Sequence, residues 1–168
     1  TYGDNVNFRT DAIGTGPVTY KWQESAGMLW NDLSEAVFAA QDSTSSLSLL
    51  SPAVVYNGRR YRCIVSALCG DVTSDEVLLS VNKADVLVAA DTLQKFYGAD
   101  MPVLTASYSG FKNGETLANS GISGDPVLTT SAGKYSNIGS YPISINTGTL
   151  AADNYNMLVQ GSVFSVLA

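Results

Sequence analysis

The chain of 168 residues contains no histidine, and only 14% of its residues are charged. Without histidine it lacks the commonest general base and the commonest metal ligand of proteins. It has no run of eighteen apolar residues, so we expect no membrane insertion within this fragment. The acidic residues that could form a catalytic pair lie in turns and loops. We therefore expect no catalytic residues, no metal site and no cofactor, and we predict that the chain is not an enzyme.

Basic residues are also scarce, and the formal net charge is −6. The one cluster of basic side chains is Arg59, Arg60 and Arg62, and strand alternation places Arg60 and Arg62 on one solvated face. A protein that binds nucleic acid needs many lysine and arginine side chains to neutralise phosphates. The sequence therefore predicts no nucleic-acid partner, and an anionic membrane surface is disfavoured for the same reason.

What the sequence has instead is an alternation of apolar and polar residues with a period of two, which is typical of half-buried strands. In the first half, turn-forming residues such as Asn57-Gly58 separate these segments. Several short strands within about 80 residues favour a β-sandwich. Segment 32–40 instead has helical spacing, so we expect a short helix or an irregular crossover there. The predicted strands of this half are 5–12, 18–23, 45–51, 60–65 and 77–81.

Three groups of residues give the first half a family resemblance. Trp22 lies mid-strand in Tyr-Lys-Trp-Gln, Trp30 begins Trp-Asn-Asp-Leu, and Tyr61 begins Tyr-Arg-Cys-Ile-Val-Ser-Ala-Leu-Cys-Gly. A core tryptophan on one strand and a tyrosine two residues before a cysteine on a later strand are features of the immunoglobulin fold. Residues 1–82 therefore resemble the bacterial immunoglobulin-like repeats of large secreted surface proteins. The resemblance implies an immunoglobulin-like β-sandwich with Trp22 and Tyr61 as core markers.

The same resemblance bears on the two cysteines. Thr10 occupies the strand position at which immunoglobulin domains have the first cysteine of their inter-sheet disulfide. A catalytic thiol would need a base, and zinc would need further ligands, and the sequence offers neither. We therefore expect a disulfide between Cys63 and Cys69 that brackets the turn after the Tyr-Arg-Cys strand, with two reduced thiols as the alternative. A disulfide would also indicate an oxidising compartment.

After Lys83 the composition changes, and no further cysteine or tryptophan occurs. Ordered markers follow, and together they are similar to the Tyr-Gly type repeat domain of bacterial adhesins, the MBG domain. The resemblance covers residues 84–168. It implies a small β-grasp-like domain with one helical turn near 115–119, or a small sandwich. The markers are Phe96-Tyr97-Gly98, Pro102-Val103-Leu104-Thr105, residues 110–116 (Gly-Phe-Lys-Asn-Gly-Glu-Thr), Gly139-Ser140-Tyr141-Pro142-Ile143 and Asn154-Tyr155-Asn156.

Together the two resemblances predict an all-β chain of two domains, 1–82 and 84–168. They imply an exported bacterial protein, extracellular or at the cell surface, in which these are adhesin-like repeats that act as spacer or display modules. The alternative is a module that itself binds a host protein or a polysaccharide. Trp30 and Tyr97 are the candidate binding-surface residues for such a protein or carbohydrate partner, because exposed aromatic side chains near turns give contact area at low entropic cost.

Overall fold

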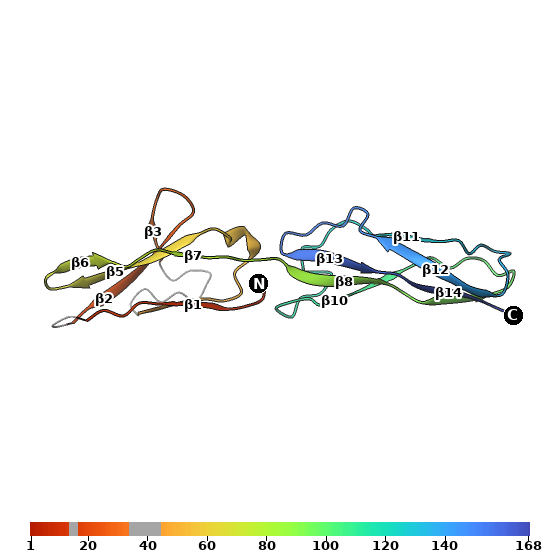
Figure 1. Ribbon diagram of the computed structural model, residues 1–168, viewed down its shortest axis with the longest axis horizontal. Coiled ribbons are helices and arrows are strands. Elements are labelled where there is room, and N and C mark those ends of the chain that lie inside the picture. The colour runs from red at the N-terminus through yellow and green to blue at the C-terminus, as the bar shows by residue number, and fades with distance from the viewer. Residues whose placement is uncertain (14–16, 34–44) are drawn as a thin grey trace. The chain divides into compact units, whose positions relative to one another are not determined.

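The computed structural model describes residues 1–13, 17–33 and 45–168 (Figure 1). It divides into two compact units, Thr1–Lys83 and Ala84–Ala168. The described residues form strands and a single 3-10 helix, η1 (Val54–Tyr56). The all-β class predicted from the period-two patterns is therefore confirmed. Among these residues no helix is long and apolar enough to cross a membrane.

The first unit consists of two sheets that face each other. The smaller sheet pairs β1 with β4, and the larger has the order β3-β2-β5-β6, with β7 also paired to β5. All of these pairings are antiparallel. This pairing is that of an immunoglobulin-like sandwich, in which the Trp22 strand lies beside the strand that contains Cys63. The strands are β1 (Val6–Arg9), β2 (Thr19–Ser25), β3 (Asn31–Asp32), β4 (Ser46–Leu49), β5 (Arg60–Ala67), β6 (Gly70–Thr73) and β7 (Val77–Leu78).

The core of the first unit lies between these sheets. Alternation along β5 turns Tyr61, Cys63 and Val65 inward, and Trp22 pairs with Cys63 across β2 and β5. The Phe8 ring of β1 lies 5.4 Å from the Tyr61 ring, so the two sheets touch through aromatic side chains. The helix or crossover expected at 32–40 lies mostly outside the described residues. Of that segment, Asp32 ends β3 and Leu33 is buried in the core.

The second unit is described throughout and also has two sheets, of order β10-β8-β13 and β11-β12-β14-β9. Buried side chains of both sheets, among them Ala90, Ile143 and Phe164, form its core. No helix occurs anywhere in 84–168, and within 115–119 only residues 117–119 form a turn. Of the two folds expected for this half, the sandwich is therefore the one that forms. The strands are β8 (Ala84–Ala90), β9 (Leu93–Phe96), β10 (Ala106–Ser109), β11 (Val127–Thr130), β12 (Gly139–Asn146), β13 (Tyr155–Gln160) and β14 (Ser162–Leu167).

The first two strands of the second unit pair in parallel with its last two. Strand β8 pairs with β13, and β9 pairs with β14. The chain therefore crosses from one sheet to the other between β8 and β9 and again between β13 and β14, and these two crossings lie side by side (Figure 1). The Oγ of Ser162 donates to the carbonyl of Asp91 and the Nδ2 of Asn156 donates to the carboxylate of Asp85, and each bond joins residues 71 apart. Both ladders keep this same offset. The two segments therefore form one continuous parallel pair that bends between the sheets.

Candidate functional site

The two cysteines do not form the disulfide that was expected. Both are free: Cys63 is buried in the core and Cys69 is exposed in the turn between β5 and β6. Strand β5 continues from Cys63 to Ala67. At about 3.3 Å per residue, the end of the strand, and with it the turn that contains Cys69, lies roughly 13 Å from Cys63. A disulfide requires Cα atoms within about 7 Å. The prediction failed because Cys69 lies in the turn itself, whereas the residue opposite Cys63 is Ser74, whose N–H donates to the Cys63 carbonyl.

The core markers Trp22 and Tyr61 both lie between the sheets, with Trp22 only 2% exposed. Burial raises the pKa of Tyr61 to about 12, and the negative charge of Glu24 acts in the same direction. Glu24 is itself held by Arg59, with an oxygen 2.8 Å from the guanidinium. These contacts give Tyr61 and Glu24 a structural role at the end of the sheet.

Trp30, a candidate binding residue, does not present a free aromatic face. The guanidinium of Arg62 lies 4.0 Å from the centre of its ring, which is a cation–π contact. Arg62 also donates to Gln23 at 2.9 Å, and Gln23 donates to Asp32 at 2.7 Å. The ring is therefore one end of a polar row on the outer face of β2, β3 and β5. Sequence patterns gave no signal for this row, because its members come from three strands.

Tyr97, the other candidate, lies in an exposed aromatic cluster that we call the Tyr-Gly surface. It consists of Phe96, Tyr97 and Tyr135, which are 63%, 55% and 71% exposed. The Gly98 N–H donates to the Lys134 carbonyl at 3.2 Å, which brings the two loops together. Gly98 has φ +79°, a conformation that favours glycine. The structure thus places the turn of Tyr97 beside the distant loop that contains Tyr135.

A buried lysine supports the Tyr-Gly surface from below. Lys95 is 6% exposed, and its ammonium donates to the carbonyls of Lys134, Ala99 and Phe96 at 2.8, 3.2 and 3.5 Å. An ammonium has three protons to donate, so these three acceptors compensate for its burial. Sequence reasoning missed Lys95. The only indication of its burial in the sequence is weak: alternation from Leu93 along β9 places Lys95 on the inward face of the strand.

Two other sequence markers of the second unit meet at Tyr155. Its hydroxyl donates to Glu115 and accepts the Lys112 N–H at 2.9 Å. Its ring lies edge-on to Phe111, with centroids 6.0 Å apart. Gly110 passes so close to β8 that an added Cβ would lie 3.0 Å from the Asp85 carbonyl oxygen. The Gly-Phe-Lys-Asn-Gly-Glu-Thr and Asn-Tyr-Asn motifs are therefore packing partners.

Asp91 joins strands at the bend between β8 and β9. The hydroxyls of Ser107 and Thr105 donate to its carboxylate at 2.5 and 2.6 Å. These two hydrogen bonds hold the pKa of Asp91 below its usual value. Because its carboxylate accepts both hydroxyls, Asp91 attaches the start of β10 at the bend.

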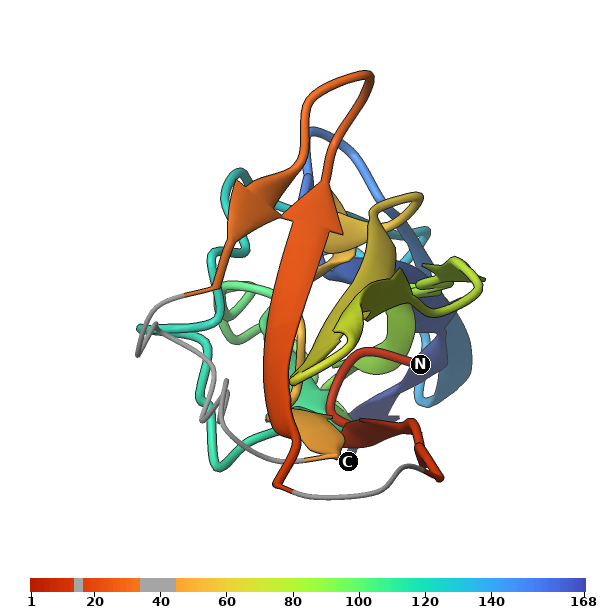
Figure 2. The ribbon, with the colours of Figure 1, turned by 90° about the vertical axis from the view of Figure 1, so that its left-hand side faces the viewer.

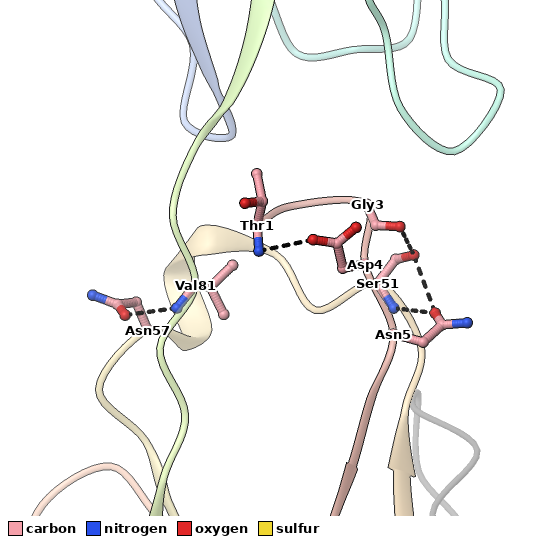
Figure 3. A network of polar contacts seen from close by, with 7 residues as sticks. All are labelled: Thr1, Gly3, Asp4, Asn5, Ser51, Asn57 and Val81. Atoms are coloured by element: carbon pink, nitrogen blue, oxygen red, sulfur yellow. Dashed lines mark hydrogen bonds and ion pairs between the residues drawn. The ribbon is translucent and has the colours of Figure 1, made fainter.

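A polar network closes one end of the first unit (Figure 3). The Asn5 Oδ1 accepts the Ser51 N–H at 3.0 Å, and the Ser51 hydroxyl donates to the Gly3 carbonyl at 3.3 Å. Asn57 accepts the Val81 N–H at 2.8 Å. Nearby, the Tyr2 N–H donates to the Asn82 carbonyl at 2.8 Å. The first and last segments of this unit are therefore fixed at the same end of the sandwich.

No group of three or more histidine, cysteine or acidic side chains that could hold a metal ion occurs in ranges 1–13, 17–33 and 45–168. Tyr61, Lys95, Tyr155 and Asp91 are each held by structural partners. The candidate residues thus fall into two kinds: exposed aromatic side chains near the Tyr97 turn, and polar clusters that join neighbouring strands.

The structural similarities to solved proteins are to tandem immunoglobulin domains. The N-terminal four immunoglobulin domains of Dscam1 isoform 9.44 match with a TM-score of 0.44 and 15% identity, over 99% of this chain and 42% of that one. The N-terminal eight immunoglobulin domains of DSCAM isoform 1.30.30 match with 0.43 and 14%, over 99% and 24%. This chain thus spans less than half the length of either structure. No curated protein matches the sequence.

A family model gives the firmer result. The MBG domain (YGX type) matches residues 86–165, within the second unit. The Tyr97-Gly98 turn that the name describes is the one supported by Lys95. The resemblance inferred from the motifs of this half is therefore confirmed. Residues 86–165 are an MBG domain of the YGX type, a domain typical of bacterial surface repeat proteins.

Proposed function

We propose that this chain is a non-catalytic part of an exported, adhesin-like bacterial surface protein, and that its MBG domain is a spacer that resists tension. The observation that supports the proposal is the parallel pairing of the first two strands of that domain with its last two, β8 with β13 and β9 with β14. Because the pair is parallel, Ala84 and Leu167 lie at its opposite ends. A force that pulls on the two ends of the domain therefore acts along the strands.

The direction of the force decides how the hydrogen bonds between strands share the load. Bonds of a ladder run across the strands, so a pull along the strands loads many of them at once. A pull that starts at one end of the pair loads them one after another. Both β8–β13 and β9–β14 would be loaded together in the first case, because they share one register. Such a domain suits a module that holds another domain away from a cell surface.

Single-molecule pulling on the intact chain tests this proposal. Handles are attached in a Cys69→Ser background, since Cys69 is exposed. One variant has Lys83→Cys with Ala168→Cys, and the matched control has Lys83→Cys with Asp153→Cys. The control pulls from one end, because the Ala84 N–H is bonded to the Asn154 carbonyl there. The two variants therefore load the same hydrogen bonds between β8 and β13, the first by a pull along the strands and the control by a pull from one end of the pair.

We expect the domain to unfold at a force at least about twofold higher with the 83–168 handles than with the 83–153 handles at one pulling speed. Forced unfolding reports the barrier to unfolding rather than the equilibrium free energy. Equal unfolding forces for the two geometries would remove the support for a tension-bearing spacer. The domain would then serve at most as a display module.

A second candidate function is recognition of a protein or polysaccharide at the Tyr-Gly surface. The observation in its favour is that Phe96, Tyr97 and Tyr135 are all more than half exposed. Amphipathic rings of this kind are common in binding surfaces. Titration with soluble polysaccharides, followed by the fluorescence of the chain, would test it with Tyr97→Ser and the control Tyr20→Ser. Binding that is equal in both variants would exclude this surface.

A further inference from the structure

The chain contains two Asn-Gly pairs, Asn57-Gly58 and Asn113-Gly114, and both lie at tight turns. In such a pair the glycine nitrogen can attack the side-chain amide carbon of the asparagine, because glycine has no Cβ to hinder the approach. Ammonia leaves and a succinimide ring forms. Water then opens the ring to aspartate or to isoaspartate, in which the main chain runs through the side chain. Both asparagines are exposed, so exposure does not decide which of them reacts.

Ring closure places a requirement on the backbone of the asparagine. The ring contains its Cα, Cβ, Cγ and carbonyl carbon, together with the nitrogen of the next residue. In an L-residue, Cβ eclipses that nitrogen only when ψ is about −120°, which is the ψ of the first central residue of a type II′ turn. In a type II turn, the mirror image, the same angle is about +120° and Cβ points away from the nitrogen.

The first Asn-Gly pair is held in the unfavourable turn. It lies between η1 and β5, the strand beside β2 in the larger sheet (Figure 2). Asn57 has φ −57° and ψ 132°, and Gly58 has φ +85°, which together define a type II turn. The Arg59 N–H closes this turn by donating to the Tyr56 carbonyl at 3.2 Å.

Hydrogen bonds also occupy both reacting groups of the first pair. The Gly58 N–H, which contains the attacking nitrogen, donates to the Leu79 carbonyl at 2.8 Å. The Asn57 Oδ1 accepts the Val81 N–H at 2.8 Å (Figure 3). Ring closure would therefore break both of these hydrogen bonds in addition to changing the turn. The fold thus protects Asn57.

The second Asn-Gly pair lies at a turn of the opposite hand. Asn113 has φ +55° and Gly114 has φ +70°, and the Glu115 N–H donates to the Lys112 carbonyl at 2.9 Å. Positive φ at both central residues makes this a type I′ turn. A type II′ turn also has positive φ at its first central residue, so rotation of the peptide group between Asn113 and Gly114 converts one turn into the other. Glycine permits the negative φ that this rotation gives to the second position.

No contact of the second pair opposes this rotation. Among the residues described, no hydrogen bond involves the Asn113 side chain or the Gly114 N–H. No atom lies within 4 Å of the position that a Cβ would take on Gly114. The flanks of the turn stay fixed meanwhile, because the Lys112 N–H and the Glu115 carboxylate are both bonded to the Tyr155 hydroxyl. The geometry that ring closure requires is therefore within reach of the folded chain.

We propose that Asn113 is a site of self-modification, at which the Gly114 nitrogen attacks the side-chain amide and water completes the conversion to aspartate or isoaspartate. The new carbon–nitrogen bond forms as the bond to the departing ammonia breaks, so water is the only co-reactant. The product has one additional negative charge. In isoaspartate the main chain also gains a carbon atom between Lys112 and Gly114, which strains the turn and weakens its contacts with Tyr155. This inference goes beyond the spacer role and does not depend on it.

Incubation of the intact chain in neutral buffer, followed by proteolysis and mass spectrometry of the two Asn-Gly peptides, tests the proposal. Asn57 is an internal control, because it is present in the same sample. In the folded chain Asn113 should be converted at least about tenfold faster than Asn57, because only its backbone lets the reacting atoms meet. In concentrated urea the two rates should be similar, because neither turn is then held. The rate at Asn113 should rise with pH, because the attack requires loss of the Gly114 amide proton.

Two variants sharpen the test. Gly114→Ala adds a methyl group that hinders the attacking nitrogen, so it should slow conversion at Asn113 at least about tenfold. The matched control is Gly58→Ala, also at a glycine with positive φ and open space around it, which should leave the rate at Asn113 unchanged. Asn113→Asp has the added charge without the longer main chain. It should keep the melting temperature of the second unit, whereas conversion to isoaspartate should lower it.

Three results would overturn the proposal. The first is conversion in the folded chain that is equally slow at Asn113 and Asn57 while both react in urea, because the second turn would then protect its asparagine as well. The second is conversion to aspartate without any isoaspartate, which would show direct hydrolysis of the amide instead of a ring. The third is a Gly114→Ala chain that reacts as fast as the unchanged chain. If Gly114→Ala does not fold, the comparison of the folded chain with the chain in urea decides the result.

Discussion

The two units have similar lengths and are both built of two β-sheets, yet their strands are paired in opposite ways. In the first unit all pairing is antiparallel, and its first and last segments are bonded at one end, Tyr2 to Asn82. In the second unit the first two strands pair in parallel with the last two, and Ala84 and Leu167 lie at opposite ends of that pairing. The second arrangement suits a module that resists tension. Among the described residues of the first, β1 and β6 are each paired on one side.

Both units bury large aromatic side chains, but they differ in their tight backbone approaches. The first has Trp22 and Tyr61 between its sheets. The second buries Phe164 and Tyr155, and in its turns Gly124 and Gly148 approach backbone oxygens so closely that no Cβ fits. We therefore expect loss of core volume to destabilise the first unit and an added Cβ at these glycines to destabilise the second.

The largest effect is expected for Trp22→Ala, which should destabilise the first unit by about 3–5 kcal/mol because it leaves a cavity in the core. Trp30→Ala should cost only about 1 kcal/mol, because that half-buried ring makes mainly the cation–π contact with Arg62. Calorimetry of the intact chain should show two transitions, of which Trp22→Ala lowers one. If both transitions fell equally, the two units would share one cooperative core.

A smaller effect of the opposite kind is expected for Gly124→Ala in the second unit. Gly124 has φ +80°, and an added Cβ would lie 2.2 Å from the Thr149 carbonyl oxygen. Overpacking together with an unfavourable left-handed conformation should cost roughly 2–4 kcal/mol. Gly58→Ala is the matched control in the first unit, with φ +85° and no atom within 4 Å of the added Cβ. Urea unfolding that gives equal losses for both variants would contradict the close-approach account.

A pH effect should follow from the burial of Tyr61. The pKa of Tyr61 is raised to about 12 in the folded chain, above the ordinary value near 10. The stabilisation of its neutral form is therefore complete below about pH 10 and is lost as the pH rises towards 12. The melting temperature of the first unit should fall over this interval, and Tyr61→Phe should make the fall shallower. The difference in tyrosinate absorbance between the unchanged chain and Tyr61→Phe during the same titration identifies the group.

The smallest effect is expected for Cys69→Ser. Because Cys69 is exposed and forms no disulfide with Cys63, the substitution should change the free energy of unfolding by less than about 0.5 kcal/mol. The melt should also be unchanged by a reducing agent. A loss of about 2 kcal/mol that appears only under oxidising conditions would show that the two cysteines do pair.

Much of this molecule could be predicted because alternation is a local property. Period-two patterns identified strands in both halves, and the alternation of Tyr61, Cys63 and Val65 determined which face of β5 is buried. The markers from Phe96 to Tyr155 identified the MBG domain, because turns and close packing require particular residue types at particular places. Local pattern thus determined the fold class and the residues that face inward.

The tertiary structure decided which strands are partners, because pairing joins residues far apart in the sequence and leaves no local pattern. Nothing in residues 84–90 indicates a parallel partner 71 positions later. The same holds for Val72, whose alternation predicts burial but whose exposure depends on how far β1 and β4 extend. The cysteine prediction failed for this reason too. The position of the β5–β6 turn, and not the spacing of the cysteines, determined that Cys63 faces Ser74 and that Cys69 faces solvent.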